Sequence, residues 1–504
     1  MRPVRVGLNG SPKHAFSTCR KRTFRKLPEP PEGFRVVKAI VCFRHGDRSA
    51  SYNLFEPDAD AAIREALGWA LELPSRKETK QLEKYAPKLR SQFSQRPRDS
   101  GLGVFGKLTA RGIRQTSLLG QWLAQQYVPS GNFSIPNHEA VTCFSSNYSR
   151  TISSAQSVLK ELLGPSVVDG NLVRVKVSSP TEEFINVYPF LPRLQKLMYD
   201  AAVDPNGDIA VSDKSMRQVQ LELVQMLPSF AFNIRRFSWL NYQDHFHCRA
   251  GRSNVPASIV RAKVTTKLHE YLGEHMVAET TNEDVKRLVR RLSDYITDED
   301  AEMIFNSIDQ DSNGKISFEE MLRFSETGFP SLQPMDLEKR MWEISECVES
   351  HVFNRFEAWY NSRTILNLAI GRLVRKIYSE MTDNRKARPI VMNASSTAPR
   401  ITLVSGHDIT IFPLLQSIGA WRDRPKVWPR YASTVIFEVL QKKGGPDRCI
   451  RAFYFHGFKD DGEPDIKMDE LVFGDISGTH PFGEPKKLLP LSDFKEFAES
   501  FSAE

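Results

Sequence analysis

The apolar positions of this chain fall into two kinds of run. Short continuous runs, typical of strands buried on both faces, cover residues 36–43, 140–145 and 401–404. In longer runs apolar residues recur every three or four positions, and these predict helices over residues 109–123, 152–162, 365–377 and 411–418. Because strands and helices alternate, we expect an α/β protein with a largely parallel sheet.

The stretch of residues 186–362 has a different pattern. Helical periodicity dominates it and strand signals are sparse. We interpret it as a mainly helical cap inserted into a core that residues 34–185 and 363–504 form. The region before residue 105 carries basic residues at the spacing of a solvated helix face, over residues 76–90, and otherwise reads as polar and irregular.

The chemistry of the chain is concentrated where the predicted strands end. The first strand stops at Arg44, His45, Gly46, Asp47 and Arg48. Ligands bind at the carboxyl ends of strands in α/β sheets, and arginine pairs with phosphate through two parallel hydrogen bonds, so these residues favour a phosphate site. A neutral histidine between two arginines is a nucleophile that can attack phosphorus. The alternative from these residues alone is a solvated charge cluster.

Two later turns carry matching residues. Arg150 follows the second strand at the start of a helix, where anions bind favourably. His407 and Asp408 follow the strand that ends near residue 404, again where a helix begins. A carboxyl group beside a phosphate-binding histidine can serve as a general acid. A lone histidine is more often structural, so this prediction depends on the pairing of His407 with Asp408.

A second motif lies inside the predicted cap, over residues 309–320. It matches the calcium-binding loop of an EF-hand, which needs alternating side-chain oxygens, one backbone carbonyl and a final bidentate carboxylate. The expected ligands are Asp309, Asp311, Asn313, Lys315 and Glu320. Gly314 permits the sharp turn, and helical patterns on both sides predict an EF-hand over residues 297–326. We expect any paired loop, within about residues 281–295, to have lost its ligands.

Length, net charge and cysteine spacing restrict the possible domain organisation, binding partners and metal sites. A length of 504 residues predicts one large domain with an insertion, or two domains. A net charge of +8 suits an anionic substrate, but no basic run is interleaved with aromatic residues, so we expect no nucleic-acid partner. The six cysteines form no CxxC pair. The stretch from Asp244 to Cys248 has no second ligand pair at metal spacing, so a structural role is favoured over zinc binding.

The first 33 residues are basic and end in a cluster of prolines, which predicts a disordered tail. They lack the apolar core of a secretory signal peptide, and no stretch of eighteen apolar residues predicts a membrane span. These absences favour the cytoplasm. The alternative is an organellar transit peptide, because such peptides are also rich in arginine and poor in acidic residues.

Together these pieces resemble the histidine acid phosphatases, in branch 2 of the histidine phosphatase superfamily. The resemblance rests on the order and spacing of Arg44 to Arg48, Leu108-Thr109 with Gly112 and Gln115, Ser145 to Thr151, Gly406 to Asp408, and Pro429 to Ser433 with Glu438. Residues 359–376 and 412–441 look similar to the 2-phosphoxylose phosphatase subgroup, into which the EF-hand would be an insertion.

The resemblance implies a three-layer, phosphoglycerate-mutase-like α/β core under a mainly helical cap. It also implies that His45 attacks the phosphoryl group to form a phosphohistidine and that Asp408 protonates the leaving oxygen. The phosphoryl oxygens would be held by Arg44, Arg48, Arg150 and His407. No metal takes part in this reaction, so bound calcium would be structural or regulatory.

Three functions remain open. The favoured one is a phosphomonoester hydrolase for a phosphorylated small molecule or sugar, because every catalytic residue type is present. An inositol polyphosphate phosphatase or phytase is the second, and it would need a strongly basic cap rim. The third is a calcium-binding regulatory protein with an inert phosphatase core, against which the intact His45 and Asp408 argue. The sequence does not indicate the oligomeric state.

Overall fold

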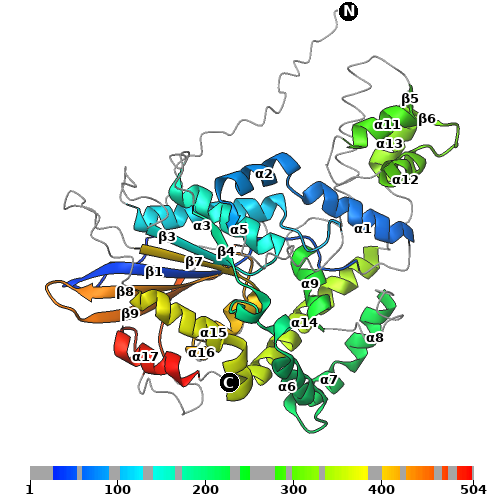
Figure 1. Ribbon diagram of the computed structural model, residues 1–504. Helices are drawn as coiled ribbons and strands as arrows, with labels where there is room; N and C mark the ends of the chain where they lie inside the picture. The colour runs from blue at the N-terminus through cyan, green and yellow to red at the C-terminus, as the bar shows by residue number, and fades with distance from the viewer. Residues whose placement is uncertain are drawn as a thin grey trace, which may run out of the picture.

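The structure is a computed structural model, and its described residues form one large sheet between two layers of helices, with further helices beside it (Figure 1). The described ranges are residues 26–53, 59–89, 103–128, 140–164, 173–226, 239–249, 279–290, 298–327, 335–383, 400–420, 427–458, 468–474 and 485–501. The predicted α/β class is therefore confirmed.

The large sheet has nine strands in the order β10-β9-β8-β1-β7-β3-β4-β2, with β11 paired to β9. Its strands are β1 (Phe34–Arg44), β2 (Lys88–Leu89), β3 (Val141–Ser145), β4 (Val175–Val177), β7 (Arg400–Gly406), β8 (Thr434–Lys442), β9 (Arg448–Phe455), β10 (Met468–Leu471) and β11 (Leu489–Pro490). The half from β1 to β2 is parallel, and the pairings from β1 to β10 are antiparallel. All nine strands come from the two segments predicted to form the core.

Register brings three strand ends to one place. Arg44 at the end of β1 lies opposite Gly406 at the end of β7. Ser145 at the end of β3 lies opposite Ser405. Because these strands are parallel neighbours, the turns that follow them emerge side by side at one edge of the sheet.

Helices cover both faces of the sheet (Figure 1). One layer contains α2 (Arg76–Tyr85), α3 (Ala110–Tyr127) and α5 (Ser149–Leu163), and the other contains α15 (Arg363–Thr382), α16 (Asp408–Ser417) and α17 (Leu491–Ser500). Strand β1 contributes alternate side chains to two apolar cores: Val41 and Phe43 to the first, Ile40 and Cys42 to the second. This two-faced burial explains why its sequence is continuously apolar.

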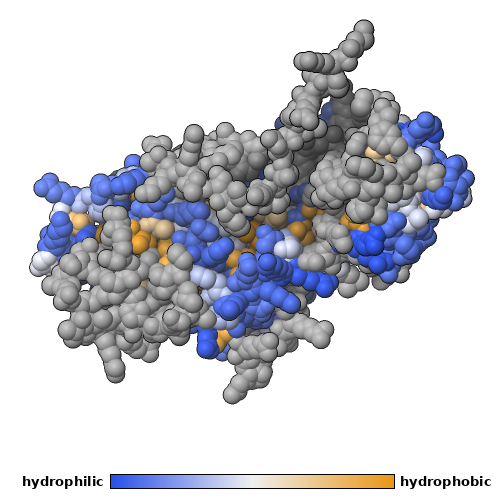
Figure 2. Space-filling view, turned by 90° about the horizontal axis from the view of Figure 1, so that it is seen from above, coloured by the Kyte–Doolittle hydropathy of each residue, from blue (hydrophilic) through white to orange (hydrophobic). Residues whose placement is uncertain are grey.

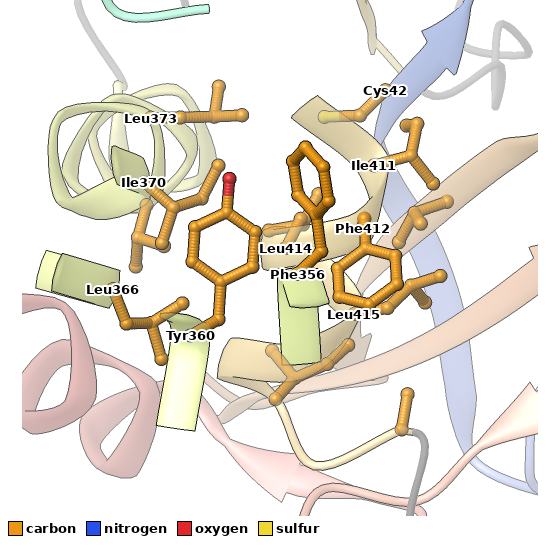
Figure 3. Close-up of a cluster of buried hydrophobic side chains, with 14 of the residues drawn as sticks. Cys42, Phe356, Tyr360, Leu366, Ile370, Leu373, Ile411, Phe412, Leu414 and Leu415 are labelled. Atoms are coloured by element: carbon orange, nitrogen blue, oxygen red, sulfur yellow. The ribbon is translucent and has the colours of Figure 1, made fainter. Parts of the chain in front are cut away.

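The second core extends beyond the sheet. Phe356 and Tyr360 pack against Phe412 of α16, with Cys42 and Leu373 nearby (Figure 3). Residues that precede α15 in the chain therefore share a core with the sheet. On the face seen from above, hydrophilic residues cover much of the described surface, and hydrophobic ones show along its middle (Figure 2).

The described residues from 180 to 361 are mainly helical, as predicted for residues 186–362. They form η1 (Pro180–Glu182), η2 (Tyr188–Phe190), α6 (Pro192–Val203), α7 (Asp208–Ser215), α8 (Arg217–Met226), α9 (Trp239–Arg249) and α14 (Met335–Asn361). Between α9 and α14 the chain forms a smaller unit of β5 (Glu279–Thr281), α11 (Asn282–Arg290), α12 (Asp298–Ile308), β6 (Lys315–Ser317) and α13 (Phe318–Thr327). Within the described ranges, no helix combines the length and apolar character needed to cross a membrane.

Two expectations need correction. The region before residue 105 is not all irregular, because it contains α1 (Ala59–Glu72) as well as the expected basic helix α2. Helix α1 buries Trp69 in a small cluster with Ala50 and Cys248, and Cys248 comes from the distant helix α9, so local periodicity does not reveal this packing.

The second correction concerns the N-terminal tail. Leu27 is buried in the first core, and its backbone N–H donates to Gln126 Oε1 over 2.8 Å. Arg451 donates to the carbonyls of Pro28 and Glu29. Residues 27–29 are therefore docked on the core, and the predicted tail ends before them. Residues 1–25, with the transit-peptide alternative, lie outside the described residues.

Candidate active site

His45 is held rigidly at the end of β1. Its backbone N–H donates to Gly406 O over 3.0 Å, and its carbonyl accepts from Ala432 N over 3.1 Å. Ala432 has φ of 56°, a left-handed conformation that is costly for alanine and brings its N–H against His45. The ring Nδ1 lies 2.7 Å from Gly46 O. A carbonyl can only accept, so Nδ1 carries the proton and Nε2 keeps its lone pair in the neutral ring.

The surroundings keep this ring neutral. His45 is 2% exposed. Burial lowers the pKa of His45 well below its usual value, and the positive charges of Arg150 and Arg44 lower it further. The imidazole is therefore a nucleophile with its lone pair available even at mildly acidic pH.

Two glycines let the loop after β1 rest directly on helix α3. A Cβ built on Gly46 would lie 2.4 Å from Gly112 O, and one on Gly112 would lie 2.1 Å from Asp47 O. Thr109 caps α3 and donates its hydroxyl to the carboxylate of Asp47. Gln115 Oε1 accepts from the Asp47 backbone N–H over 2.7 Å. The start of α3 thus fixes the position of the loop.

The guanidinium of Arg44 is buried between Pro429, Asp408 and Tyr431. Its Nη1 donates to Pro429 O, its Nη2 lies 2.8 Å from Asp408 Oδ2, and its guanidinium stacks 4.2 Å from the centre of the Tyr431 ring. Arg44 is 1% exposed, yet its Nε has no hydrogen-bond partner among the described residues. A buried donor without a partner is unfavourable and indicates a place for an acceptor.

Arg48 repeats this arrangement. Its two Nη atoms donate to both carboxylate oxygens of Asp244, and Nη1 also donates to Ser49 O over 2.9 Å. Its buried Nε, too, has no partner among the described residues. Burial acts to lower the pKa of Arg48, but the carboxylate of Asp244 outweighs burial and raises it above its usual value. Both arginines thus keep Nε for a ligand.

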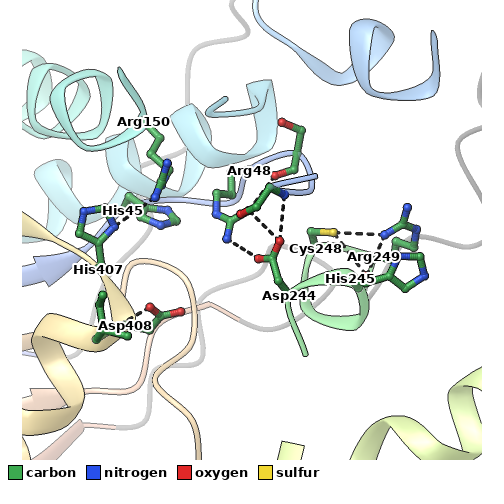
Figure 4. Close-up of polar contacts among 12 residues, drawn as sticks. His45, Arg48, Arg150, Asp244, His245, Cys248, Arg249, His407 and Asp408 are labelled. Carbon is green, nitrogen blue, oxygen red and sulfur yellow. Dashed lines mark hydrogen bonds and ion pairs between the residues drawn. The ribbon is translucent and has the colours of Figure 1, made fainter. Parts of the chain in front are cut away.

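Arg150 and His407 form the opposite side (Figure 4). Arg150 Nη2 lies 3.4 Å from His407 Nδ1, and Ser146 Oγ lies 2.8 Å from Nε2. Because a guanidinium only donates, Nδ1 accepts and Nε2 carries the proton that Ser146 receives. The rings of His45 and His407 are 5.5 Å apart, and burial followed by Arg150 lowers the pKa of His407 well below its usual value.

Asp408 is the first residue of α16 and pairs with Arg44. Burial acts to raise the pKa of Asp408, but the positive charges of Arg44 and Arg48 outweigh it and lower the pKa to about 2. Its oxygens also accept from Ile409 N over 2.8 Å and from Trp428 Nε1 over 3.2 Å.

The residues predicted from separate turns therefore lie together. The structure joins six residues in one cluster at the sheet edge: Arg44, His45, Arg48, Arg150, His407 and Asp408. All of them except the partly exposed Asp408 are buried, and Figure 4 shows how His45, Arg48, Arg150, His407 and Asp408 lie. Sequence reasoning missed Asp244, because it assigned that stretch only a structural role. Nothing in the local pattern around Asp244 indicates that α9 reaches Arg48.

Comparison with known families agrees with this cluster. Residues 35–455 match the family model described as "Histidine phosphatase superfamily (branch 2)". The chain belongs to this superfamily. As a member of this superfamily, the chain is a phosphatase enzyme. No curated protein matches the sequence.

Solved structures with a similar trace include other phosphatases. The phytase of Hafnia alvei is 11% identical, with a TM-score of 0.45 over 94% of this chain and 98% of that one. The Citrobacter braakii phytase is 11% identical, with a TM-score of 0.46 over 93% and 98%. The Bifidobacterium longum multiple inositol polyphosphate phosphatase, in complex with inositol hexasulfate, is 11% identical, with a TM-score of 0.40 over 94% of each chain. These likenesses concern the chain trace, and the family assignment rests on the sequence match.

The predicted calcium loop of this phosphatase lies between α12 and α13. Ligand atoms of Asp309, Asp311 and Glu320 lie within 4.8 Å of one another. Gly314, with φ of 82°, makes the expected turn, and its N–H donates to Asp309 Oδ2 over 2.9 Å. Asn313 Oδ1 accepts from the backbone N–H of Lys315, which begins β6. This oxygen-rich donor set fits the preference of calcium.

The loop has a partner strand. Thr280 of β5 pairs with Ile316 of β6 in an antiparallel two-stranded sheet, and α11 follows β5 directly. A strand followed by a helix is what β6 and α13 also form. Strand β5 and helix α11 overlap residues 281–295, where a paired loop without ligands is expected, and residues 250–278 and 291–297 lie outside the described residues.

Proposed function

We propose that this enzyme hydrolyses phosphate monoesters of small molecules or sugars through a phosphohistidine on His45. The observation that carries the proposal is the pair of buried, unpartnered Nε donors on Arg44 and Arg48, on either side of a neutral His45 with its Nε2 lone pair available. A phosphoryl group accepts from such donors, and its phosphorus is the electrophile that the imidazole attacks.

The reaction has two steps. In the first, His45 Nε2 forms a bond to phosphorus while the ester P–O bond breaks, and the leaving oxygen takes the proton of Asp408. In the second, Asp408 takes a proton from water, the resulting hydroxide oxygen bonds to phosphorus, and the N–P electron pair returns to Nε2. The equatorial oxygens are stabilised by Arg44, Arg48, Arg150 and His407.

The acid role requires Asp408 to gain a proton first. Its pKa of about 2 in the free enzyme comes from pairing with Arg44. A phosphate ester competes for Arg44 and adds negative charge beside Asp408, and both effects raise the pKa of this carboxyl group. The monoanionic form of the substrate supplies the proton. The negative charge of the phosphate ester also raises the pKa of His407. His407 Nδ1 can then take a proton and donate a hydrogen bond to the phosphoryl group.

A phosphorylated sugar is the first substrate class to test. The likeness of residues 359–376 and 412–441 to the 2-phosphoxylose phosphatase subgroup supports this choice. Residues from both stretches, Tyr360 and Phe412 among them, belong to the core beneath the site.

We also propose that the loop from Asp309 to Glu320 binds Ca²⁺. Its donors would be the side chains of Asp309, Asp311, Asn313 and Glu320 and the carbonyl of Lys315, and the ion would stabilise this unit of the cap without entering the reaction. The observed closeness of the three carboxylates supports this, because their repulsion falls when a cation binds.

A phosphate-release screen tests the proposed activity. The full chain is incubated with p-nitrophenyl phosphate, sugar phosphates, inositol phosphates, phosphopeptides and phosphorylated lipids, with chelator and no added metal. We expect release from p-nitrophenyl phosphate and from at least one sugar monophosphate. Release from none of these compounds, by a folded protein, would show that the core is inert.

A further inference from the structure

Helix α9 of the cap reaches into the phosphate site. Its residue Asp244 accepts from both Nη atoms of Arg48, and Asp244 Oδ2 also accepts from the backbone N–H of Ser51 over 2.9 Å. The side chains of Arg48 and Asp244 are only 8% and 11% exposed. This is therefore a buried, bidentate pair, a kind in which geometry is strongly fixed.

The C-terminal end of α9 is anchored to helix α1. Arg249 pairs with Glu65 of α1, and Trp69 Nε1 donates to the same carboxylate over 2.7 Å. Cys248 packs beside Trp69 in the small apolar cluster. Because the C-terminal end of α9 is tied to α1, the helix holds Asp244, at its middle, in place against Arg48 (Figure 4).

The pair determines which edge of Arg48 a ligand meets. Asp244 accepts one N–H from each Nη atom, and Ser49 O accepts the second N–H of Nη1. The donors that these contacts leave for a ligand are therefore Nε and the second N–H of Nη2, which lie on one edge of the guanidinium. Without Asp244 the guanidinium could rotate and present its Nη atoms instead. Arg44 pairs with Asp408 through one contact, from Nη2 to Oδ2, and that carboxylate must take up a proton during turnover, whereas Asp244 has no such step.

The carboxylate also adds negative charge beside the arginines of the phosphate site. Its charge acts on Arg150 and on Tyr431 as well as on Arg48, so it lies near the whole phosphate cluster. A substrate with one phosphoryl group places that group on the arginines. A second phosphoryl group close to the first would meet Asp244, and like charges in a buried site are strongly unfavourable.

We propose that Asp244 is a positioning and specificity-determining residue that orients Arg48 and makes the enzyme select singly phosphorylated substrates over substrates with adjacent phosphoryl groups. This inference rests on the proposed monoester hydrolysis and names its substrate class. It also separates this enzyme from one built for highly phosphorylated ligands, which needs positive charge where this chain has a carboxylate.

The test compares Asp244→Asn with the parent and with Asp200→Asn. Asp200 pairs with Lys196 on the exposed surface of α6, so its variant makes the same change in charge far from Arg48. We measure kcat/KM for a hexose monophosphate and a hexose bisphosphate at low and high salt. In Asp244→Asn we expect the monophosphate value to fall about tenfold and the bisphosphate-to-monophosphate ratio to rise about fivefold or more. High salt should leave most of the rise in place, because charges in a buried site are screened much less than exposed charges.

If Asp244 had only a structural role, the substitution would lower kcat/KM for both substrates by the same factor and leave their ratio unchanged. That result would overturn the proposal. An equal rise in Asp200→Asn would overturn it too, because the effect would then come from net charge. Calorimetric titration with orthophosphate and pyrophosphate needs no turnover and keeps the test independent of the proposed hydrolysis. The ratio of pyrophosphate to orthophosphate affinity should rise in Asp244→Asn alone, and an unchanged ratio contradicts the inference even if the parent hydrolyses no ester.

Discussion

The phosphate site and the predicted calcium loop are built in opposite ways. The phosphate site takes its groups from segments far apart in the chain: the loop after β1, the start of α5, helix α9 and the start of α16. The calcium loop takes all of its expected ligands from twelve consecutive residues between α12 and α13. One site exists only when the whole sheet has formed, and the other needs two short helices and a turn.

This difference has consequences for what each site tolerates. The phosphate site depends on close backbone contacts that leave no room for an added side-chain atom, such as the approach of Gly112 to Asp47. The calcium loop satisfies its own backbone, because the carboxylates of Asp309 and Glu320 accept from backbone N–H groups within the loop. We therefore expect distant substitutions to disturb the phosphate site and only ligand substitutions to disturb the loop.

The largest expected effect is the loss of the nucleophile. His45→Ala should lower kcat by about four orders of magnitude or more, because it removes the nitrogen that attacks phosphorus in the proposed reaction. His456→Ala removes a half-buried histidine that follows β9, two strands from β1, and pairs with Asp469 of β10, so this variant should keep most of the parental activity. Near-parental turnover by folded His45→Ala would refute the covalent route.

Substitution of the acid should depend on the leaving group. Asp408→Asn keeps the size of the side chain but cannot donate a carboxylic proton, so hydrolysis of a sugar phosphate should slow by roughly a hundredfold to ten-thousandfold. Hydrolysis of p-nitrophenyl phosphate should slow much less, since that leaving group needs little protonation. Steady-state kinetics with both substrates gives the two ratios, and equal slowing would exclude Asp408 as the acid.

Calcium should stabilise the loop from Asp309 to Glu320 without changing the phosphate site. A ligand that binds only the folded protein adds about 2.7 kcal/mol to the free energy of unfolding at a hundredfold excess over its Kd. We expect calcium to raise the Tm of the parent and of Glu319→Gln, whose side chain is the exposed neighbour, but not of Glu320→Gln, which lacks the bidentate carboxylate. No heat in calorimetry and no thermal shift at millimolar calcium would contradict a binding loop.

The smallest effect tests dependence on backbone contacts. Gly112→Ala places a methyl group against Asp47 O, so the free energy of unfolding should fall by on the order of 1–3 kcal/mol and KM should rise as the His45 loop shifts. Gly445→Ala, whose Cβ would lie 4.0 Å from Asp447 N in an ordinary contact, is the matched control. Urea unfolding and steady-state kinetics give both quantities. Equal stability of the two variants would show that the loop and α3 can separate at no cost.

The reactive strand ends could be predicted because each one combines an apolar run with an abrupt polar stop. His45, Arg150 and His407 were found in this way, and the fold confirms that their turns meet. The calcium loop was predictable for a simpler reason, since its residues are consecutive.

The rest depends on tertiary contacts that leave no periodic signal. Asp244 acts on Arg48 only because Arg249 docks α9 on α1, and α1 itself is stabilised by packing against α9. Neither helix indicates its partner in the sequence. The ionised state of Asp408 likewise follows from the position of Arg44, which only the folded chain reveals.

Trapping the covalent intermediate is the most direct test of the mechanism. The enzyme is mixed with p-nitrophenyl phosphate, quenched in alkali within milliseconds, digested and examined by mass spectrometry. We predict phosphorylation of the peptide that contains His45, at a higher level in Asp408→Asn because that variant lacks the base for attack by water, and none in His45→Ala. Burst release of p-nitrophenol with no phosphorylated His45 at any quench time would contradict the account.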